Sequence, residues 1–255
     1  KLSSSIKIIS NFAVGFGNID IVAAKKKNII VTNTPEVLTD ATAEIAMLVL
    51  LGAARRAKEG MEWANKKNWK WSADFLMGKQ LSGARLGILG MGRIGRAVAH
   101  RARSFGMIIH YYNRSKLDKN LEQGAIYHSS LESLLSVSNF FSINCPATKE
   151  TKHIINKDTL KHFPDGAILS NTARGDMIDD NAMVQALKSG KIFSLGLDVY
   201  NGEPNIHPDY LTLSNVFVLP HIGSSTLQTR TAMGNLAVSN LEEFFKTGNC
   251  KNKVN

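Results

Sequence analysis

The glycine-rich segment Gly90-Met91-Gly92-Arg93-Ile94-Gly95 constrains the fold of this chain more than any other feature. The apolar run 86–89 before it has the composition of a buried strand, and a helical pattern begins directly after it. In such a unit the first glycine permits the tight turn, the second lets the backbone approach a pyrophosphate, and the third lets helix and strand pack closely. The helix N-terminus then favours the anion. The segment predicts a dinucleotide site, and the alternative is a tight turn that binds no ligand.

Strand and helix patterns alternate from residue 85 onward. The predicted strands are residues 85–89, 107–112, 139–145, 167–170, 193–199 and 216–219, and the predicted helices are 94–105, 130–137, 157–162 and 179–189. Strands that alternate with helices of this length are typical of a parallel sheet covered on both faces. The predicted fold class is therefore α/β, with a doubly wound parallel sheet of the Rossmann type.

The first part of the chain opens as strand, helix and strand. Two β-branched runs, 6–10 and 28–32, flank a short helix that Asn18 is predicted to cap. A long helix is then predicted from Thr39 or Asp40 to about Lys67. It carries the longest apolar run, which is too short to span a bilayer. A final amphipathic helix is predicted over 225–246.

Composition narrows the classes of partner. Hydrophobic residues make up 44% and charged residues 20%, which is typical of a soluble globular protein. The net charge of +10 is divided among small basic clusters, and we find no nucleic-acid-binding motif. The two cysteines lack the spacing of a metal site or a disulfide framework, and the chain opens without a visible signal peptide. We therefore expect a cytoplasmic protein with no metal, no membrane partner and no nucleic-acid partner.

The segment Asn113-Arg114-Ser115 bears on the choice of dinucleotide. It follows the second strand of the predicted sheet, about 20 residues after the glycine turn, where a carboxylate would hold a ribose 2′-hydroxyl. No carboxylate is present, whereas an arginine pairs strongly with a 2′-phosphate, and Asn and Ser can add hydrogen bonds. The segment predicts a preference for NADP(H), with NAD(H) as a possible second cofactor. The alternative is that Arg114 is an ordinary surface arginine.

Three polar residues, Arg174, Glu203 and His221, follow predicted strands in the second half of the chain. In open α/β sheets, ligands bind beyond the carboxyl ends of the strands. Arginine can bind a carboxylate in a fork and polarise the adjacent carbonyl. Histidine is a suitable general acid near neutral pH, and a carboxylate beside it favours its protonated form. The set predicts a hydride reaction on a 2-oxo acid. Taken singly, each residue has an ordinary alternative, namely a capping arginine, a Glu-Pro turn or an exposed histidine.

At this point the chain resembles the D-isomer-specific 2-hydroxyacid dehydrogenases over essentially its whole length. The matching segments occur in the family's order and comprise residues 13–15, 34–39, 90–95, 171–176, 196–199, 203–204 and 220–226. Within the family the chain is most similar to the glyoxylate/hydroxypyruvate reductases, partly because of residues 113–115 and 69–78.

The resemblance implies a role for each candidate site residue. Arg174 would bind the substrate carboxylate and carbonyl, while His221, supported by Glu203, would donate the proton. Further substrate contacts would come from Val14, Gly15, Ser224 and Trp71. Trp71 resembles a residue lent to the neighbouring subunit's active site, with plain core or interface packing as the alternative. The dinucleotide would contact Gly90, Gly92, Arg93, Ile94, Gly95, Asn113, Arg114, Ser115, Cys145, Pro146, Thr151, Thr172, Ala173, Asp198 and Gly223.

The resemblance also implies the reaction and the assembly. We expect NADPH-dependent reduction of small 2-oxo acids, such as glyoxylate and hydroxypyruvate, to D-2-hydroxy acids by hydride transfer. The protein would be a homodimer joined through its cofactor domain. Three alternatives stay open at this point: another D-2-hydroxyacid dehydrogenase such as a phosphoglycerate-type enzyme, a dinucleotide-binding corepressor-like protein, and a non-catalytic fragment that binds cofactor and dimerises.

The family's organisation sets the expected domains. Its substrate domain is flavodoxin-like and begins with further strand–helix units before the equivalent of Lys1. We therefore expect an N-terminally truncated chain whose incomplete substrate domain comprises residues 1–33. A Rossmann domain would span 34–222, including the linker and dimerisation helix. Residues 223–255 would form a helix that returns to the substrate domain.

Overall fold

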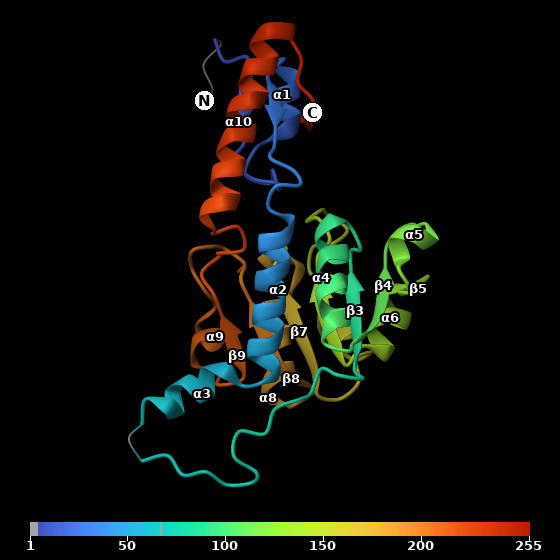
Figure 1. The fold of residues 1–255 in the computed structure, drawn as a ribbon, viewed down its shortest axis with the longest axis vertical. Helices are drawn as coiled ribbons and strands as arrows, with labels where there is room; N and C mark the ends of the chain where they lie inside the picture. Colours follow the sequence, from blue (N-terminus) through green and yellow to red (C-terminus); the bar gives the residue numbers. More distant parts are fainter. Residues whose placement is uncertain (1–4, 67) are drawn as a thin grey trace. The chain divides into compact units, whose positions relative to one another are not determined.

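The computed structural model describes residues 5–66 and 68–255, and the chain divides into two compact units (Figure 1). The smaller unit joins Lys1–Ala41 to Ser224–Asn255, and the larger unit is Thr42–Gly223. The sequence placed the divisions at 33/34 and 222/223. Each unit contains its own sheet.

In the described part of the larger unit, seven strands form one parallel sheet in the order β5-β4-β3-β6-β7-β8-β9. The strands are β3 (Arg85–Leu89), β4 (Ile108–Tyr112), β5 (Ile126–His128), β6 (Phe140–Ile143), β7 (Ala167–Asn171), β8 (Ile192–Leu197) and β9 (Val216–Val218). The chain runs outward from β3 in one direction and from β6 in the other. The order therefore reverses between β3 and β6, as in the doubly wound Rossmann fold. The predicted fold class is confirmed.

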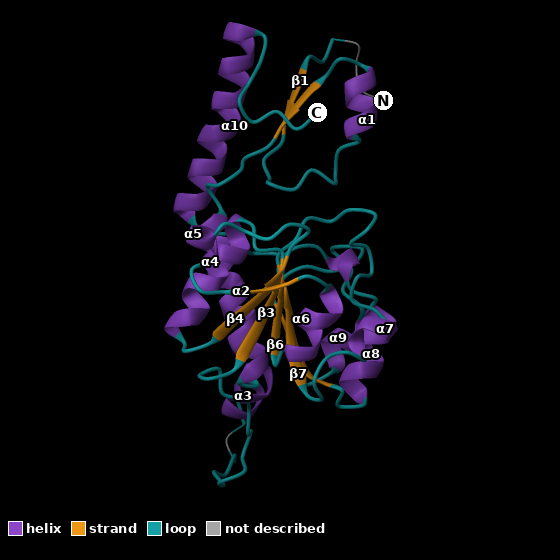
Figure 2. Cartoon of the chain, turned by 90° about the vertical axis from the view of Figure 1, so that its right-hand side faces the viewer, coloured by secondary structure: helices purple, strands orange, loops and turns teal. Residues whose placement is uncertain are grey.

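Helices cover both faces of this sheet. On one face, α2 (Thr39–Ala54) and α4 (Arg93–Ser104) bury residues such as Leu50 and Val98 against Ile88 of β3. On the other face, α6 (Leu131–Val137), α7 (Lys157–Leu160) and α8 (Asp180–Lys188) pack in a second core with Leu169 and Leu195. Figure 2 shows α4 and α8 on opposite sides of the strands. Every residue of β6 and β7 is buried, as expected for strands covered on both faces.

The single long helix predicted from Thr39 or Asp40 to Lys67 is wrong. Helix α2 ends at Ala54, and a separate helix, α3, spans Ala57–Ala64. Between them Arg56 has a left-handed backbone with φ of 53°, which a right-handed helix cannot accommodate. The Arg56 side chain pairs with Glu59 in the first turn of α3, with 2.7 Å between Nε and Oε2. The predicted helix end at Lys67 lies outside the described residues.

Other predicted boundaries also need correction. Helix α1 (Ile21–Lys26) is capped by Asp20, which accepts a hydrogen bond from the amide of Ala23, so the predicted cap by Asn18 is wrong. The Asn18 side chain instead donates to Asn11. Three short elements lack a strong periodic pattern and were not predicted, namely α5 (Lys119–Glu122), β5 and α9 (Pro208–Thr212). The remaining ends coincide with the prediction or differ from it by at most two residues, and β3 has the predicted bounds.

In the described part of the smaller unit, β1 (Ile8–Ser10) pairs in parallel with β2 (Ile30–Thr32). Helix α10 (Leu227–Thr247) packs on β1, and its Asn240 donates to the carbonyl of Asn33. The final residues run antiparallel along β2, with the amide of Val254 donating to Val31. Among the described residues, no helix has the length and apolar character needed to cross a membrane.

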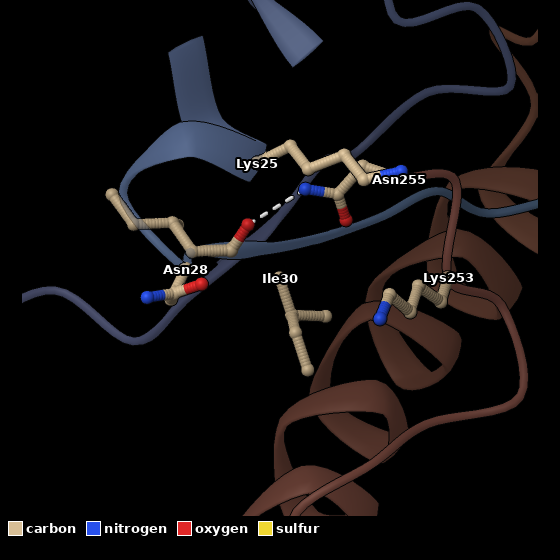
Figure 3. Close-up of a pocket in the computed structure, with 6 residues that line it drawn as sticks. Lys25, Asn28, Ile30, Lys253 and Asn255 are labelled. Atoms are coloured by element: carbon tan, nitrogen blue, oxygen red, sulfur yellow. Dashed lines mark hydrogen bonds between the residues drawn. The ribbon is translucent and has the colours of Figure 1, made fainter. Parts of the chain in front are cut away.

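A pocket in the smaller unit lies where the chain's last residues pass β2 (Figure 3). The dashed line in the figure marks the side-chain amide of Asn255, which donates to the carbonyl of Ile29. None of the residues predicted to bind substrate or cofactor lines this pocket, whose walls are formed by Lys25, Asn28, Ile29, Ile30, Lys253 and Asn255.

Candidate active site

The three glycines of the turn after β3 differ in the space that a Cβ would have at each position. Gly90 has a φ of +93°, and a Cβ there would lie 2.5 Å from the amide nitrogen of Cys145. A Cβ at Gly95 would overlap the carbonyl oxygen of Gly90. At Gly92, by contrast, a Cβ would have no described residue within 4 Å apart from its own neighbours in the chain. Gly92 is the N-cap residue of α4 and, because it has no side chain, it does not occupy the first amides of the helix. The turn therefore leaves an open helix N-terminus, which suits the pyrophosphate of a dinucleotide.

Two asparagines flank this turn. Asn113, after β4, accepts a hydrogen bond of 2.7 Å from the amide of Met91, so its side-chain oxygen is used to fasten the turn. Its side-chain NH₂ group is the part that can face a ligand. Asn144, after β6, has a buried Oδ1 with no hydrogen-bond partner among the described residues. A buried acceptor normally needs a donor. Asn144 follows β6, beside the point where the strand order reverses between β3 and β6. Its Oδ1 oxygen could accept a hydrogen bond from a hydroxyl or amide group of a bound ligand.

The contrast between Gly92 and Gly95 gives a prediction. Gly92→Ala fills open space, so it should weaken dinucleotide binding about tenfold or more while changing thermal stability little. Gly95→Ala places a methyl group against backbone, so it should lower the free energy of unfolding by about 1–3 kcal/mol. Thermal denaturation without ligand and titration with the dinucleotide would measure the two effects. The prediction fails if Gly92→Ala is the less stable variant.

The loop after β7 places Arg174. The buried side chain of Asn171 accepts from the amide of Ala173 at 2.9 Å and donates to the carbonyl of Arg174 at 2.7 Å. Asn171 thereby fixes the backbone on both sides of the turn. A Cβ at Gly175 would overlap the backbone of Tyr200, so the Arg174 loop packs directly on the loop after β8. The Arg174 side chain itself is half-buried, and its Nη1 donates to the carbonyl of Ala173.

The loops after β8 and β9 form a carboxylate–imidazole pair. His221 Nδ1 lies 2.6 Å from Glu203 Oε2, and Glu203 Oε1 accepts from the amide of Tyr200 at 2.9 Å. Both oxygens of the carboxylate are thus engaged, and Nε2 is the imidazole nitrogen left for a substrate. The His221 side chain is 48% exposed, so solvent and small molecules can reach it. A protonated imidazole in this position can donate a proton from Nε2 while Glu203 stabilises its charge.

Asp198 shapes the turn that carries His221. Its carboxylate is 1% exposed and accepts from the amides of Ile222 and Gly223, each at 2.8 Å. Burial raises the pKa of Asp198, and these two hydrogen bonds act in the opposite direction. His221 itself has a left-handed backbone with φ of +54°. The buried carboxylate therefore organises the two residues that follow the imidazole.

Comparison with known proteins identifies the family. The model of the D-isomer specific 2-hydroxyacid dehydrogenase NAD binding domain matches residues 47–223. The chain belongs to the D-isomer-specific 2-hydroxyacid dehydrogenases. As such it is an oxidoreductase that works with a nicotinamide dinucleotide.

Three relatives illustrate the similarity. This dehydrogenase is 45% identical to the glycerate dehydrogenase of Hyphomicrobium methylovorum, over 96% of this chain and 77% of the relative. It is 44% identical to the glyoxylate reductase of Thermococcus litoralis, over 98% of this chain and 77% of the relative. Among solved structures, the NADPH-dependent glyoxylate/hydroxypyruvate reductase of Sinorhizobium meliloti, in complex with NADP and malonate, superposes with a TM-score of 0.91. That protein is 35% identical, and the match covers 98% of this chain and 78% of the other.

Within this dehydrogenase the predicted site residues of the larger unit, apart from Trp71, follow the carboxyl ends of the strands. Arg174, Glu203 and His221 follow β7, β8 and β9, which are adjacent in the sheet. The predicted dinucleotide residues follow β3, β4 and β6, and further ones lie in the three loops of the candidate catalytic residues. They are Gly90, Gly92, Arg93, Ile94 and Gly95 after β3, Asn113, Arg114 and Ser115 after β4, Cys145, Pro146 and Thr151 after β6, and Thr172, Ala173, Asp198 and Gly223 after β7, β8 and β9.

Several local contacts of this dehydrogenase refine those predictions. Thr151 closes the loop after β6, because its hydroxyl donates to the carbonyl of Pro146 at 2.9 Å. Burial raises the pKa of the Cys145 thiol to about 11, so this cysteine is protonated at neutral pH. A hydrogen bond from Thr148, together with the positive charge of Arg114, lowers the pKa of Glu150. Arg114 therefore lies near the loop that carries Thr151.

The remaining predicted site residues are those assigned further substrate contacts, namely Val14, Gly15, Ser224 and Trp71. Val14, Gly15 and Ser224 belong to the smaller unit, so their substrate contacts stay predictions. Trp71 is 78% exposed in the segment between α3 and β3. Sequence reasoning gave no role to Asn171 as a backbone clamp or to Tyr200 as the partner of Glu203. The signal for Tyr200 was its position after a strand beside a predicted site residue, and Asn171 also begins the matching segment 171–176.

Proposed function

We propose that this dehydrogenase reduces small 2-oxo acids such as glyoxylate and hydroxypyruvate, with NADPH, to D-2-hydroxy acids. The Glu203–His221 pair, formed by the loops after β8 and β9 beside the loop of Arg174 after β7, is the observation that carries the proposal. An imidazole with Nδ1 fixed by a carboxylate and Nε2 available suits proton transfer to a carbonyl oxygen. A neighbouring arginine supplies a site for the substrate carboxylate.

In the proposed mechanism, the Arg174 guanidinium binds the substrate carboxylate and polarises the adjacent carbonyl. Protonated His221 donates the Nε2 proton to the carbonyl oxygen as that oxygen gains negative charge. Glu203 keeps the ring oriented and stabilises the imidazolium before transfer. When bound, the dinucleotide supplies the hydride that reduces the substrate carbon. One hydride and one proton convert the 2-oxo acid to the 2-hydroxy acid.

The chain's own residues suit the dinucleotide. The open N-terminus of α4 at Gly92 would hold the pyrophosphate. Because the Asn113 oxygen already accepts from Met91, Asn113 would offer its NH₂ group to the ribose side. Arg114 follows directly and would pair with a 2′-phosphate. This arrangement of donors favours NADPH over NADH. The Sinorhizobium meliloti relative, named as NADPH-dependent, supports the same preference.

The cofactor preference is testable with glyoxylate and hydroxypyruvate as substrates. We expect a higher kcat/KM for NADPH than for NADH. Arg114→Gln should lower the NADPH value about 10–100-fold and leave the NADH value nearly unchanged, since one charge-assisted hydrogen bond contributes about 1.5–3 kcal/mol. The control is Arg55→Gln, which removes an exposed arginine at the end of α2. Equal kcat/KM with both cofactors would refute the NADPH assignment, and absence of turnover with either would refute the reductase proposal.

A homodimer through the cofactor domain is part of the same proposal. None of the residues described for α3 is buried, and this helix with the segment after it exposes Met61, Trp69, Trp71 and Met77. Figures 1 and 2 show this region extending away from the larger sheet. Several exposed aromatic and methionine side chains close together in one segment are typical of a surface that a partner covers. Trp71 would then reach the neighbouring subunit's active site.

A further inference from the structure

A closed ring of hydrogen bonds joins the Glu203–His221 pair to Tyr200. The Tyr200 hydroxyl donates to the carbonyl of Leu219 at 2.5 Å. The same carbonyl accepts the backbone amide of His221 at 3.1 Å. The ring continues from His221 Nδ1 to Glu203 Oε2 and closes where Glu203 Oε1 accepts the amide of Tyr200. Tyr200 therefore holds both partners of the pair. Its hydroxyl bonds the Leu219 carbonyl that accepts the His221 amide, and its main-chain amide bonds the Glu203 carboxylate.

The environment of Tyr200 keeps its phenol protonated, so the hydroxyl remains a hydrogen-bond donor. The residue is 8% exposed and belongs to the core shared by β7, β8 and α8. Burial raises the pKa of the Tyr200 phenol, and the nearby Asp198 carboxylate raises it further. The phenol therefore keeps its proton at every pH at which the enzyme would work. The hydrogen bond to Leu219 does not depend on the protonation state of His221 or Glu203.

The backbone of Tyr200 also supports the third loop. A Cβ at Gly175 would overlap the carbonyl group of Tyr200 and the amide nitrogen of Asn201. The Arg174 loop therefore packs directly on the peptide unit that follows Tyr200. The loops of Arg174, Glu203 and His221 all meet at this one residue.

We propose that Tyr200 is a positioning residue that holds the Glu203–His221 pair in the orientation needed for proton donation from Nε2. This inference rests on the proposed function, because the proton transfer belongs to the reduction of a 2-oxo acid. Tyr200 touches neither substrate nor cofactor in this role. It acts through His221, because its hydroxyl holds the Leu219 carbonyl that accepts the His221 amide and its main-chain amide holds the Glu203 carboxylate.

The test is Tyr200→Phe, which retains the ring and the main-chain bond to Glu203 and removes only the hydroxyl. The variant should fold, because the Leu219 carbonyl retains the His221 amide as a donor. We expect kcat to fall about tenfold, since small misplacements of reacting groups have effects of this size or larger. The solvent deuterium isotope effect on kcat should rise, because proton donation becomes more rate-limiting. The matched control is Tyr210→Phe, which removes a buried hydroxyl bonded to Asp180 and should leave kcat unchanged.

A double-mutant cycle separates positioning from general destabilisation. If Tyr200 acts through His221, Tyr200→Phe should change the residual kcat of His221→Ala by less than about twofold, because residues that act as one unit are not additive. An equal loss of rate in both backgrounds would overturn the proposal. An unchanged kcat in the single variant would overturn it as well.

A readout without activity keeps this inference separate from the proposed function. The low-field proton NMR signal of the bond between His221 Nδ1 and Glu203 should be present in the wild type and in Tyr210→Phe. It should be broadened or shifted in Tyr200→Phe and absent in His221→Ala. An identical signal in Tyr200→Phe and the wild type would contradict the positioning role, even if the chain reduced no 2-oxo acid. Absence of turnover with the expected signal changes would contradict the proposed function alone.

Discussion

Replacing His221 by alanine is expected to lower kcat for 2-oxo acid reduction about 10²–10⁴-fold, the range that a general acid contributes. The Glu203 carboxylate engages Nδ1 at 2.6 Å and leaves Nε2 to deliver the proton. Binding of the dinucleotide should change less than about twofold, because the glycine turn follows β3, which β6, β7 and β8 separate from β9 in the sheet. Steady-state NADPH oxidation and fluorescence titration with NADPH measure the two quantities.

The backbone of His221 requires a second variant as a control. Its φ of +54° lies in the left-handed region, which asparagine adopts with less strain than alanine. His221→Asn therefore preserves the turn held by Asp198 but cannot donate a proton as an imidazolium does. Both variants should show the same loss of kcat. If His221→Asn retained more than about a tenth of the wild-type kcat, His221 would not be the general acid.

Replacing Arg174 by lysine should lower kcat/KM for glyoxylate about 10²–10³-fold, although the positive charge is kept. Lysine cannot form the planar fork that binds a carboxylate, and charge-assisted hydrogen bonds contribute about 1.5–3 kcal/mol each. The loop itself should survive, because Asn171 holds the backbone of residue 174 through its carbonyl. The affinity for NADPH should stay close to that of the wild type.

Chemical rescue provides the control for Arg174. Guanidinium ions added to Arg174→Ala should restore part of the lost rate, whereas ammonium ions at equal concentration should not. This pattern requires that the guanidinium act directly on the substrate. If Arg174→Lys had the wild-type KM and kcat for glyoxylate, Arg174 would have no part in substrate binding.

Local rules of chain geometry were sufficient to predict the main features of the fold and the location of the candidate site. The requirement for glycine at positions 90 and 95 can be inferred from the sequence, because a strand and a helix joined by so short a turn leave no room for a Cβ at these positions. Arg174, Glu203 and His221 each follow a strand, and parallel strands bring their carboxyl ends to one edge. Their grouping could therefore be expected before any coordinates.

Contacts between distant segments could not be predicted in the same way. The break at Arg56 interrupts a periodic apolar pattern without a Gly or Pro to mark it. Asn113 was expected to face the cofactor, but its oxygen fastens the amide of Met91, a contact fixed only by the pairing of β3 with β4. The role of Tyr200 depends on Leu219, which the β8–β9 pairing brings near. Such contacts depend on strand register, and strands covered on both faces lack the alternating pattern from which register could be predicted.

The most direct test of the proposed function is the fate of hydroxypyruvate in the presence of the purified chain and NADPH. We predict that NADPH is oxidised and that D-glycerate forms in equal amount, with chiral chromatography used to assign the configuration. The same reaction should be lost in His221→Asn. Formation of L-glycerate, or NADPH binding without any oxidation by hydroxypyruvate or glyoxylate, would contradict the assignment of this chain as a D-specific 2-oxo acid reductase.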